Sequence, residues 1–296
     1  MEDNAKDEEK SIENKNDESK EIEKSNEEKK DAENVEKKEE NKEPEPPPVP
    51  KISINEEMII AGLSQLGRTH DGTSYAYSKL IIEEKEIEEI GLLLPKYINI
   101  KYLSLSKNQI KSVKEVKELP YLLHIDVSKN DLTKLDLLDD SSALKYVQII
   151  NFSSNKVTEL TPVNLQNLFH LNLNENLIAS AIKFQGHERL KILEMRKNKL
   201  NNLEGIGNMP FLSELYLAEN EITNFSKLAE LPALKKLHLR KNNISKLREI
   251  PVLPSLEYIN LRENPLEALK EVKILGNYFG LKALNILGRI KSNTCL

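Results

Sequence analysis

The fold is decided by residues 231–244, which read Leu-Pro-Ala-Leu-Lys-Lys-Leu-His-Leu-Arg-Lys-Asn-Asn-Ile. The same frame, a Leu-x-Leu pair followed by an asparagine and then an aliphatic residue, recurs along most of the chain. The asparagines are Asn108, Asn130, Asn155, Asn176, Asn198, Asn220, Asn242 and Asn264. Their spacing, roughly 22 residues with one longer step between Asn130 and Asn155, falls in the range of short repeat units. A period this regular indicates an array of stacked units.

Each unit is predicted to contribute one short strand and a return segment. Alternate strand residues face opposite sides, so pairs such as Leu215 and Leu217 point inward together. One unit cannot enclose its own leucines, and neighbouring units therefore share a continuous core. The asparagine follows the strand, where its amide can bond the backbone of the adjacent turn. We interpret the eight asparagines as a structural ladder and not as a ligand site.

The frame resembles the short class of leucine-rich repeats, which includes phosphatase regulators, dynein light chains and splicing factors. The predicted fold class is α/β: a leucine-rich repeat solenoid with a curved parallel sheet on its concave side and short helical or 3-10 segments on its convex side. Lys85 and Arg289 stand in the asparagine position of degenerate terminal units, which brings the expected count to about ten repeats.

Composition divides the chain into three parts. Residues 1–50 hold 19 acidic residues and 10 lysines and end in a proline-rich run, which predicts a disordered acidic tail with a stiff hinge. Residues 51–76 are predicted to form an N-terminal capping helix and a loop. Ser53 or Asn55 would cap this helix, Gly67 would end it, and it would cover the edge of the first strand. Residues 77–296 form the solenoid, and no capping helix is evident after Ile286.

The sequence carries no pattern typical of an enzyme. The five histidines do not pair at metal-ligand spacing, Cys295 is the single cysteine, and there is no phosphate-binding loop or nucleophile elbow. We therefore predict a non-catalytic protein with no catalytic, cofactor-binding or metal-binding residues and no small-molecule substrate. Without an apolar run of about 18 residues or a strongly basic body, we expect neither a membrane nor a nucleic acid as partner.

The concave face is the predicted partner-binding site. Its side chains lie six, four and two residues before each asparagine, and the C-terminal half of these columns is rich in arginine and tyrosine, which are enriched in interface hot spots. The predicted patch contains Arg196, Tyr216, Lys236, His238, Arg240, Tyr258 and Arg262. The alternative is an ordinary solvated face in which Glu194, Glu214 and Glu263 balance the positive charges.

A more specific resemblance lies at the start of the folded region. Residues 55–58 (Asn-Glu-Glu-Met), 61–66 (Ala-Gly-Leu-Ser-Gln-Leu) and 76–80 (Ala-Tyr-Ser-Lys-Leu) are similar to the leucine-rich repeat-containing protein 23 family. The resemblance implies a scaffold in the cytoplasm, within the ciliary or flagellar axoneme, whose partners are other radial-spoke proteins, in particular those of the third radial spoke. That family continues into a capping repeat, whereas this chain stops at Leu296. The alternative is a regulatory subunit that binds a protein phosphatase or another cytoplasmic or nuclear partner through the concave face.

Overall fold

The computed structural model describes residues 50–138, 143–248, 250–267 and 269–286. The chain divides into two units at Pro50 and Lys51, and every element described below belongs to the second unit, Lys51–Leu296. The predicted acidic tail, Arg289 and Cys295 lie outside the described residues. None of the described helices combines the length and the apolar character that crossing a bilayer requires.

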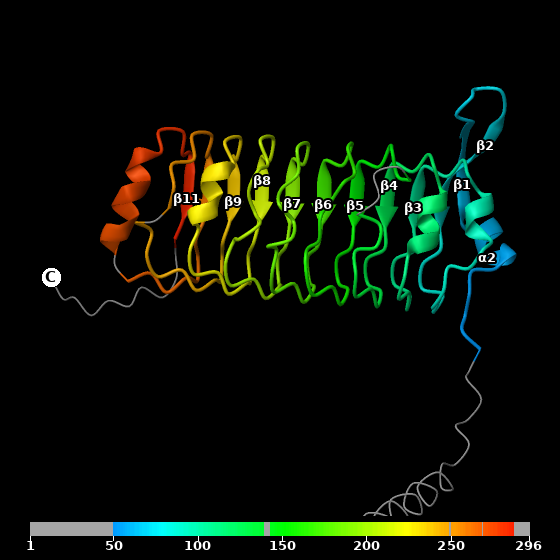
Figure 1. The fold of residues 1–296 in the computed structure, drawn as a ribbon, viewed down its shortest axis with the longest axis horizontal. Helices are drawn as coiled ribbons and strands as arrows, with labels where there is room; N and C mark the ends of the chain where they lie inside the picture. Colours follow the sequence, from blue (N-terminus) through cyan, green and yellow to red (C-terminus); the bar gives the residue numbers. More distant parts are fainter. Residues whose placement is uncertain (1–49, 139–142, 249, 268, 287–296) are drawn as a thin grey trace, which may run out of the picture. The chain divides into compact units, whose positions relative to one another are not determined.

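The folded unit is built on a single 11-stranded sheet whose spatial order follows the sequence from β1 to β11 (Figure 1). From β2 onward each strand pairs in parallel with the next. These strands are β2 (Tyr75–Ile81), β3 (Tyr102–Ser104), β4 (His124–Asp126), β5 (Ile149–Asn151), β6 (His170–Asn172), β7 (Ile192–Glu194), β8 (Glu214–Tyr216), β9 (Lys236–His238), β10 (Tyr258–Asn260) and β11 (Ala283–Asn285). This is the predicted leucine-rich repeat solenoid, with one strand from each repeat.

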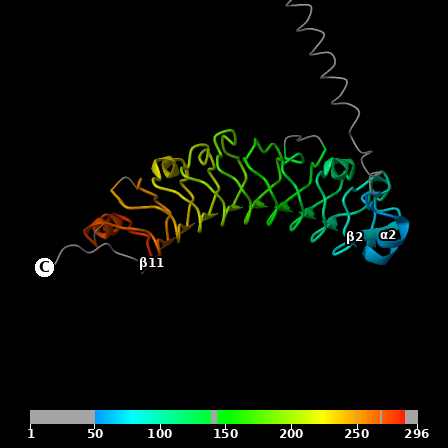
Figure 2. The ribbon, with the colours of Figure 1, turned by 90° about the horizontal axis from the view of Figure 1, so that it is seen from below.

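The sheet lines the inner side of a curve, and the helical segments lie on the outer side (Figure 2). These segments are 3-10 turns at Leu94–Lys96, Lys114–Glu118, Ser226–Glu230 and Leu269–Asn277. So short a repeat leaves room only for brief helical pieces after the strand and the turn are built. The prediction of a concave sheet and a convex side with 3-10 segments is confirmed.

The leucine frame forms one continuous core that runs the length of the solenoid. In β8, Leu215 and the following Leu217 are fully buried, while Glu214 and Tyr216 alternate with them on the partly exposed concave side. The register repeats this arrangement in each pair of strands, as Leu215 lies beside Leu237 of β9. Burial of leucines shared between neighbours is what holds one repeat against the next.

The predicted N-terminal helix is correct at its start and wrong at its end. Helix α2 (Glu56–Gly62) begins at Asn55, whose side chain accepts a hydrogen bond from the Met58 backbone N–H. The chain then turns into strand β1 (Leu63–Arg68), which pairs antiparallel with β2. A Cβ atom on Gly62 would lie 2.2 Å from the Ile81 carbonyl oxygen, so this close contact requires glycine. The exposed edge of β2, the first parallel strand, is therefore covered by its hairpin partner β1. Strand β1 satisfies the backbone hydrogen-bonding groups of this edge, which a helix cannot do because its own backbone groups are already paired.

A column of left-handed residues, which the sequence did not predict, lies directly before the asparagines. None of them is glycine, and their φ angles fall between 51 and 59°. They are Lys107, Lys129, Ser154, Glu175, Lys197, Glu219, Lys241 and Glu263. This conformation turns the chain out of the strand and directs the next side chain, the asparagine, into the core.

Candidate functional site on the concave face

The asparagine ladder is the framework that positions the concave side chains. Asn220 donates from Nδ2 to the carbonyl oxygens of Met195 in the preceding repeat (2.8 Å) and Leu217 in its own (3.1 Å). Its Oδ1 accepts from the backbone N–H of Leu200 in the preceding repeat (3.1 Å). The other ladder asparagines make the same kinds of bond, and all eight are only 3–8% exposed. Each amide thus joins two repeats through buried backbone groups.

Four of the predicted concave residues form a stacked series, which we call the concave aromatic row: Arg196, Tyr216, His238 and Tyr258. The ring centroids of Tyr216 and His238 lie 4.5 Å apart, and those of His238 and Tyr258 lie 4.9 Å apart. The Arg196 guanidinium lies over the Tyr216 ring, with Cζ 4.5 Å from its centroid. Tyr216 and His238 are direct cross-strand partners, whereas Tyr258 pairs with Lys236 and reaches His238 diagonally.

The Tyr216 and His238 rings are uncharged at neutral pH. Burial, followed by the positive charge of Arg196, lowers the pKa of His238 to about 4. Burial, followed by a hydrogen bond to a carboxylate, raises the pKa of Tyr216 to about 12. The Tyr216 hydroxyl donates this bond to Glu214 Oε2 over 2.6 Å. The two rings therefore offer flat apolar surface, and the positive charge of the row comes from Arg196.

Two cations of the predicted patch have carboxylate partners. Lys236 Nζ lies 2.8 Å from Glu214 Oε1, and Arg240 Nε donates to Glu263 Oε1 over 2.7 Å. The charge balance of the alternative interpretation is thus present at two positions. Arg262 Nε instead contacts the side-chain oxygen of Asn260 at 3.4 Å. Among the described residues, Arg262 and Arg196 are the predicted patch cations that have no carboxylate at ion-pair distance.

The middle of the concave face is polar and bonded to itself. His170 Nε2 lies 2.8 Å from Glu194 Oε1, and Asn174 donates to the second oxygen of the same carboxylate over 2.7 Å. These contacts, led by the bond with His170, lower the pKa of Glu194. Its partner is therefore His170 and not one of the patch arginines. Because these groups already satisfy one another, this central region offers a partner little unmet hydrogen-bonding capacity.

The N-terminal end of the concave face was missed at the level of sequence. Leu66, Tyr75 and Tyr77 lie on strands β1 and β2 and are at least half exposed, whereas the sequence predicts a helix and a loop for residues 51–76. The signal that could have identified the hairpin is Asp71-Gly72, a strong turn sequence, between two runs of strand-forming residues.

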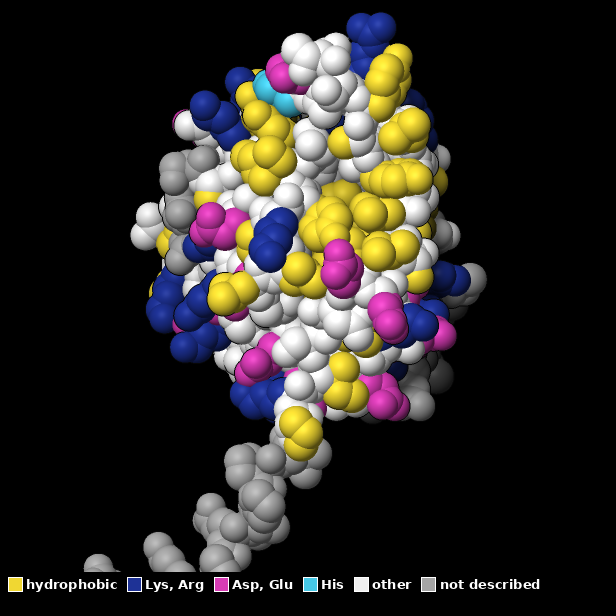
Figure 3. Space-filling view, turned by 90° about the vertical axis from the view of Figure 1, so that its right-hand side faces the viewer, with side chains coloured by type: hydrophobic (Ala, Val, Ile, Leu, Met, Phe, Trp, Pro, Cys, Tyr) yellow, Lys and Arg dark blue, Asp and Glu magenta, His cyan; other side chains and the backbone are white. Residues whose placement is uncertain are grey.

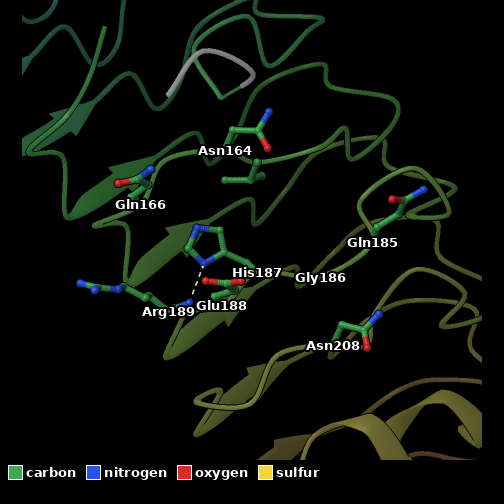
Figure 4. Close-up of a pocket in the computed structure, with 9 residues that line it drawn as sticks. Asn164, Gln166, Gln185, Gly186, His187, Glu188, Arg189 and Asn208 are labelled. Carbon is green, nitrogen blue, oxygen red and sulfur yellow. Dashed lines mark hydrogen bonds between the residues drawn. The ribbon is translucent and has the colours of Figure 1, made fainter. Parts of the chain in front are cut away.

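A cavity of about 530 Å³ lies near His187, among amide and charged side chains (Figure 4). The His187 Nε2–H donates to the Leu165 carbonyl oxygen (3.1 Å), and Nδ1 accepts from the backbone N–H groups of Leu190 (2.9 Å) and Arg189 (3.1 Å). Burial lowers the pKa of this imidazole. Both ring nitrogens are therefore occupied by the backbone, and the ring has no lone pair for a substrate proton or a metal. Within the part of the chain that the structure describes, no three His, Cys, Asp or Glu side chains are grouped to hold a metal ion.

Comparisons with known proteins agree with this architecture. The family model for leucine-rich repeats in two copies matches residues 232–274. The chain is 31% identical over 187 residues to leucine-rich repeat-containing protein 23 of Bos taurus, covering 55% of this chain and 53% of that protein. It is 32% identical over 125 residues to the protein of the same name from Homo sapiens, covering 42% and 35% of the two chains. The chain thus spans about half the length, or less, of these relatives.

Solved structures show the same fold. Internalin C2 of Listeria monocytogenes aligns with a TM-score of 0.54 and 28% identity, over 62% of this chain and 79% of that chain. The leucine-rich repeat domain of APL1B aligns with a TM-score of 0.59 and 22% identity, over 71% and 62% of the two chains, and this likeness concerns the fold alone.

Proposed function

We propose that this chain, a leucine-rich repeat solenoid similar to leucine-rich repeat-containing protein 23, is a non-catalytic scaffold that binds other proteins through its concave face. A solenoid presents an extended curved surface, and this surface suits the recognition of another chain better than the enclosure of a small substrate.

The observation that carries this proposal is the concave aromatic row. Tyrosine and arginine supply much of the binding energy at protein interfaces, and rings that are already stacked lose little conformational freedom on binding. Arg196, Tyr216, His238 and Tyr258 are held in one another's contact before a partner arrives. The ion pairs of Lys236 and Arg240 lie beside the row. The partner surface that fits best is therefore an apolar or aromatic segment with an acceptor for Arg196 or Arg262.

The cellular setting we propose is the axoneme of a motile cilium or flagellum, with radial-spoke proteins as partners, in particular those of the third spoke. The support is the resemblance of residues 55–80 to the leucine-rich repeat-containing protein 23 family. The similarity to the bovine and human proteins of that name adds to it.

The test is whether the full chain stays in cilia that have been stripped of membrane with detergent and washed with high salt. We expect an immunoblot to find the protein in the washed axonemes. We expect the double variant Tyr216→Ser with Tyr258→Ser to be lost from them while its melting temperature in pure form stays close to that of wild type. The matched control is Phe211→Ser, an aromatic side chain that is 60% exposed and lies outside the three concave columns.

Recovery of the wild-type protein only from the cell body would contradict the axonemal setting. If it co-purified there with a phosphatase catalytic subunit, the phosphatase-regulator alternative would replace our proposal. Retention of the Tyr216 and Tyr258 double variant in axonemes would mean that the row is only a solvated face.

A further inference from the structure

The N-terminal end of the concave face carries a second exposed surface, distinct from the concave aromatic row. We call it the N-terminal apolar patch and define it as Leu66, Tyr77, Ile81 and Tyr102. Their exposed fractions are 64, 50, 38 and 39%. Hydrophobic side chains gather on this end of the solenoid when it is viewed along its length (Figure 3).

Strand register places the members of this patch on one face. Leu66 of β1 lies directly opposite Tyr77 of β2, and directly opposed residues share a face of the sheet. Tyr77, Lys79 and Ile81 alternate along β2 with buried Leu80. Lys79 is in turn the strand partner of Tyr102 in β3, the first tyrosine of the concave column. The patch therefore continues the concave surface across β1, β2 and β3.

Two cations border the patch without acidic partners. Arg68 lies over the Tyr75 ring, with Cζ 5.9 Å from its centroid, and Lys79 lies between Tyr77 and Ile81 in the strand. In the described part of the chain, neither cation has a carboxylate at ion-pair distance, in contrast to Lys236 and Arg240 at the other end. The carboxylate two residues beyond Ile81, that of Glu83, accepts a hydrogen bond from the Ser104 hydroxyl over 2.5 Å.

The hairpin that presents the patch is held in place by its turn. The Thr69 backbone N–H donates to the Ser74 carbonyl oxygen over 2.9 Å, and Asp71 accepts bonds from the side chains of Thr69 and Thr73. The His70 ring stacks on that of Tyr121, with centroids 4.3 Å apart, and so attaches the turn to the solenoid. The hairpin backbone that carries the patch is thus held in place before any contact with a partner, which lowers the entropic cost of binding.

We propose that the N-terminal apolar patch binds an acidic, apolar segment of another protein. Its aliphatic or aromatic side chains would cover Leu66, Tyr77, Ile81 and Tyr102, and its carboxylates would pair with Arg68 and Lys79. A cavity of about 260 Å³ lined by Tyr77, Leu63 and Ile98 has room for one anchoring side chain. Five strand spacings, about 24 Å, separate Tyr102 from Tyr216, so this site is separate from the concave aromatic row.

The chemistry of the patch argues against two other occupants. A second copy docked about a two-fold axis would bring Arg68 and Lys79 of both copies together, and like charges repel across such an interface. Residues 1–49 of this chain are acidic, but they contain only a few isolated aliphatic residues and no aromatic residue to cover the patch. A segment that is both acidic and apolar complements the two cations and also covers the exposed apolar side chains.

The test uses the full chain and two fluorescein-labelled dodecapeptides, one made of phenylalanine, leucine and glutamate and one with lysine in place of each glutamate. We expect the acidic peptide to bind at least tenfold more tightly than the basic one. Leu66→Ser with Tyr77→Ser should weaken the acidic peptide at least tenfold, and Arg68→Glu with Lys79→Glu should reverse the preference. The control Phe211→Ser, an exposed aromatic residue outside the three concave columns, should leave binding unchanged. Equal binding of the two peptides, or wild-type affinity in the Leu66 and Tyr77 variant, would overturn the proposal.

A second measurement identifies the occupant directly and does not depend on these variants folding. Leu66 is replaced with the photocrosslinking residue p-benzoylphenylalanine in the full chain, which is then irradiated with the acidic peptide. Mass spectrometry of crosslinked fragments should show the peptide as the main product. A predominant crosslink to residues 1–49, or to an isotopically labelled second copy, would assign the patch to those occupants and overturn the proposal. Hydrogen exchange of each variant in Leu63–Arg68 and Tyr75–Ile81 establishes whether the hairpin is intact.

Discussion

Tyr216 and His238 occupy the same position in two consecutive repeats, and their rings stack with centroids 4.5 Å apart. The repeat length brings them together, because one full repeat returns the chain to the same place on the next strand. A contact of this kind depends on two consecutive repeats being formed and correctly paired. The concave aromatic row therefore reports the integrity of β7 to β10 as well as offering a binding surface.

Asn220→Leu is expected to destabilise the solenoid. The substitution leaves the buried Leu200 N–H and the Met195 carbonyl oxygen without their partners, and each unpaired buried group costs about 1–3 kcal/mol. Urea unfolding followed by circular dichroism should show a free energy of unfolding lower by about 2–4 kcal/mol. The control is Asn243→Leu, an exposed asparagine, which should change stability by less than about 0.5 kcal/mol. Equal effects of the two substitutions would contradict our account of the ladder.

Lys129→Gly is expected to stabilise the protein. Lys129 has a φ of 53°, a left-handed conformation that costs a residue with a Cβ roughly 1–2 kcal/mol. Glycine relieves this cost but adds freedom to the unfolded chain, so the net gain should be about 0.5–1 kcal/mol. Lys134→Gly, an exposed lysine without positive φ, should instead lower stability by about 0.4–1 kcal/mol. The prediction fails if both substitutions shift the urea midpoint in the same direction.

Gly62→Ala is expected to loosen the N-terminal hairpin while leaving the later repeats folded. The added methyl group would lie 2.2 Å from the Ile81 carbonyl oxygen, so α2 must move away from β2. Hydrogen exchange should become faster in Leu63–Arg68 and Tyr75–Ile81 and stay unchanged from β5 onward. Gly67→Ala is the matched control, because a Cβ there meets no atom within 4 Å. Unaltered exchange in Gly62→Ala would show that this contact does not hold the hairpin.

The pH dependence of stability should contain a contribution from His238. Its pKa falls from an ordinary value of 6.5 to about 4 on folding, so between these values the unfolded chain binds more protons than the folded one. The contribution is fully present above about pH 6.5 and is lost progressively as pH falls toward about 4. His238→Gln should therefore lose less stability than wild type between about pH 7.5 and about pH 5, as measured by urea midpoints. An identical loss in both proteins would mean that His238 titrates normally.

Most of the fold was predictable because every repeat carries the same pattern of leucines and asparagine. An ambiguous assignment in one repeat is resolved by the equivalent residues of the next. Leu215, Leu217 and Asn220 could be assigned to the strand and the turn from spacing alone. The N-terminal cap had no such redundancy. Asn55 does begin a helix, but the close approach of Gly62 to Ile81 that ends it depends on packing between segments far apart in sequence.

The candidate site was predictable in its members and not in its charges. Glu214 and Lys236 stand in the same column one repeat apart, so their ion pair could have been inferred from register. The pair of Arg240 with Glu263 could not, because Glu263 reaches Arg240 from a left-handed turn position outside the strand columns. The ion pairs in the structure determine which of these arginines and lysines a partner can use.

The asparagine ladder has a direction. Each asparagine side-chain oxygen accepts a hydrogen bond from a backbone N–H of the preceding repeat. Asn130 accepts in this way from Ile110, and Asn242 accepts from Ile222. A repeat therefore acquires its last buried hydrogen bond only when its C-terminal neighbour is in place. As the chain leaves the ribosome, this backbone N–H of the newest repeat stays unpaired until the following repeat has emerged. Assembly of the solenoid is thus expected to lag synthesis by one repeat, with each arrival completing the repeat that preceded it.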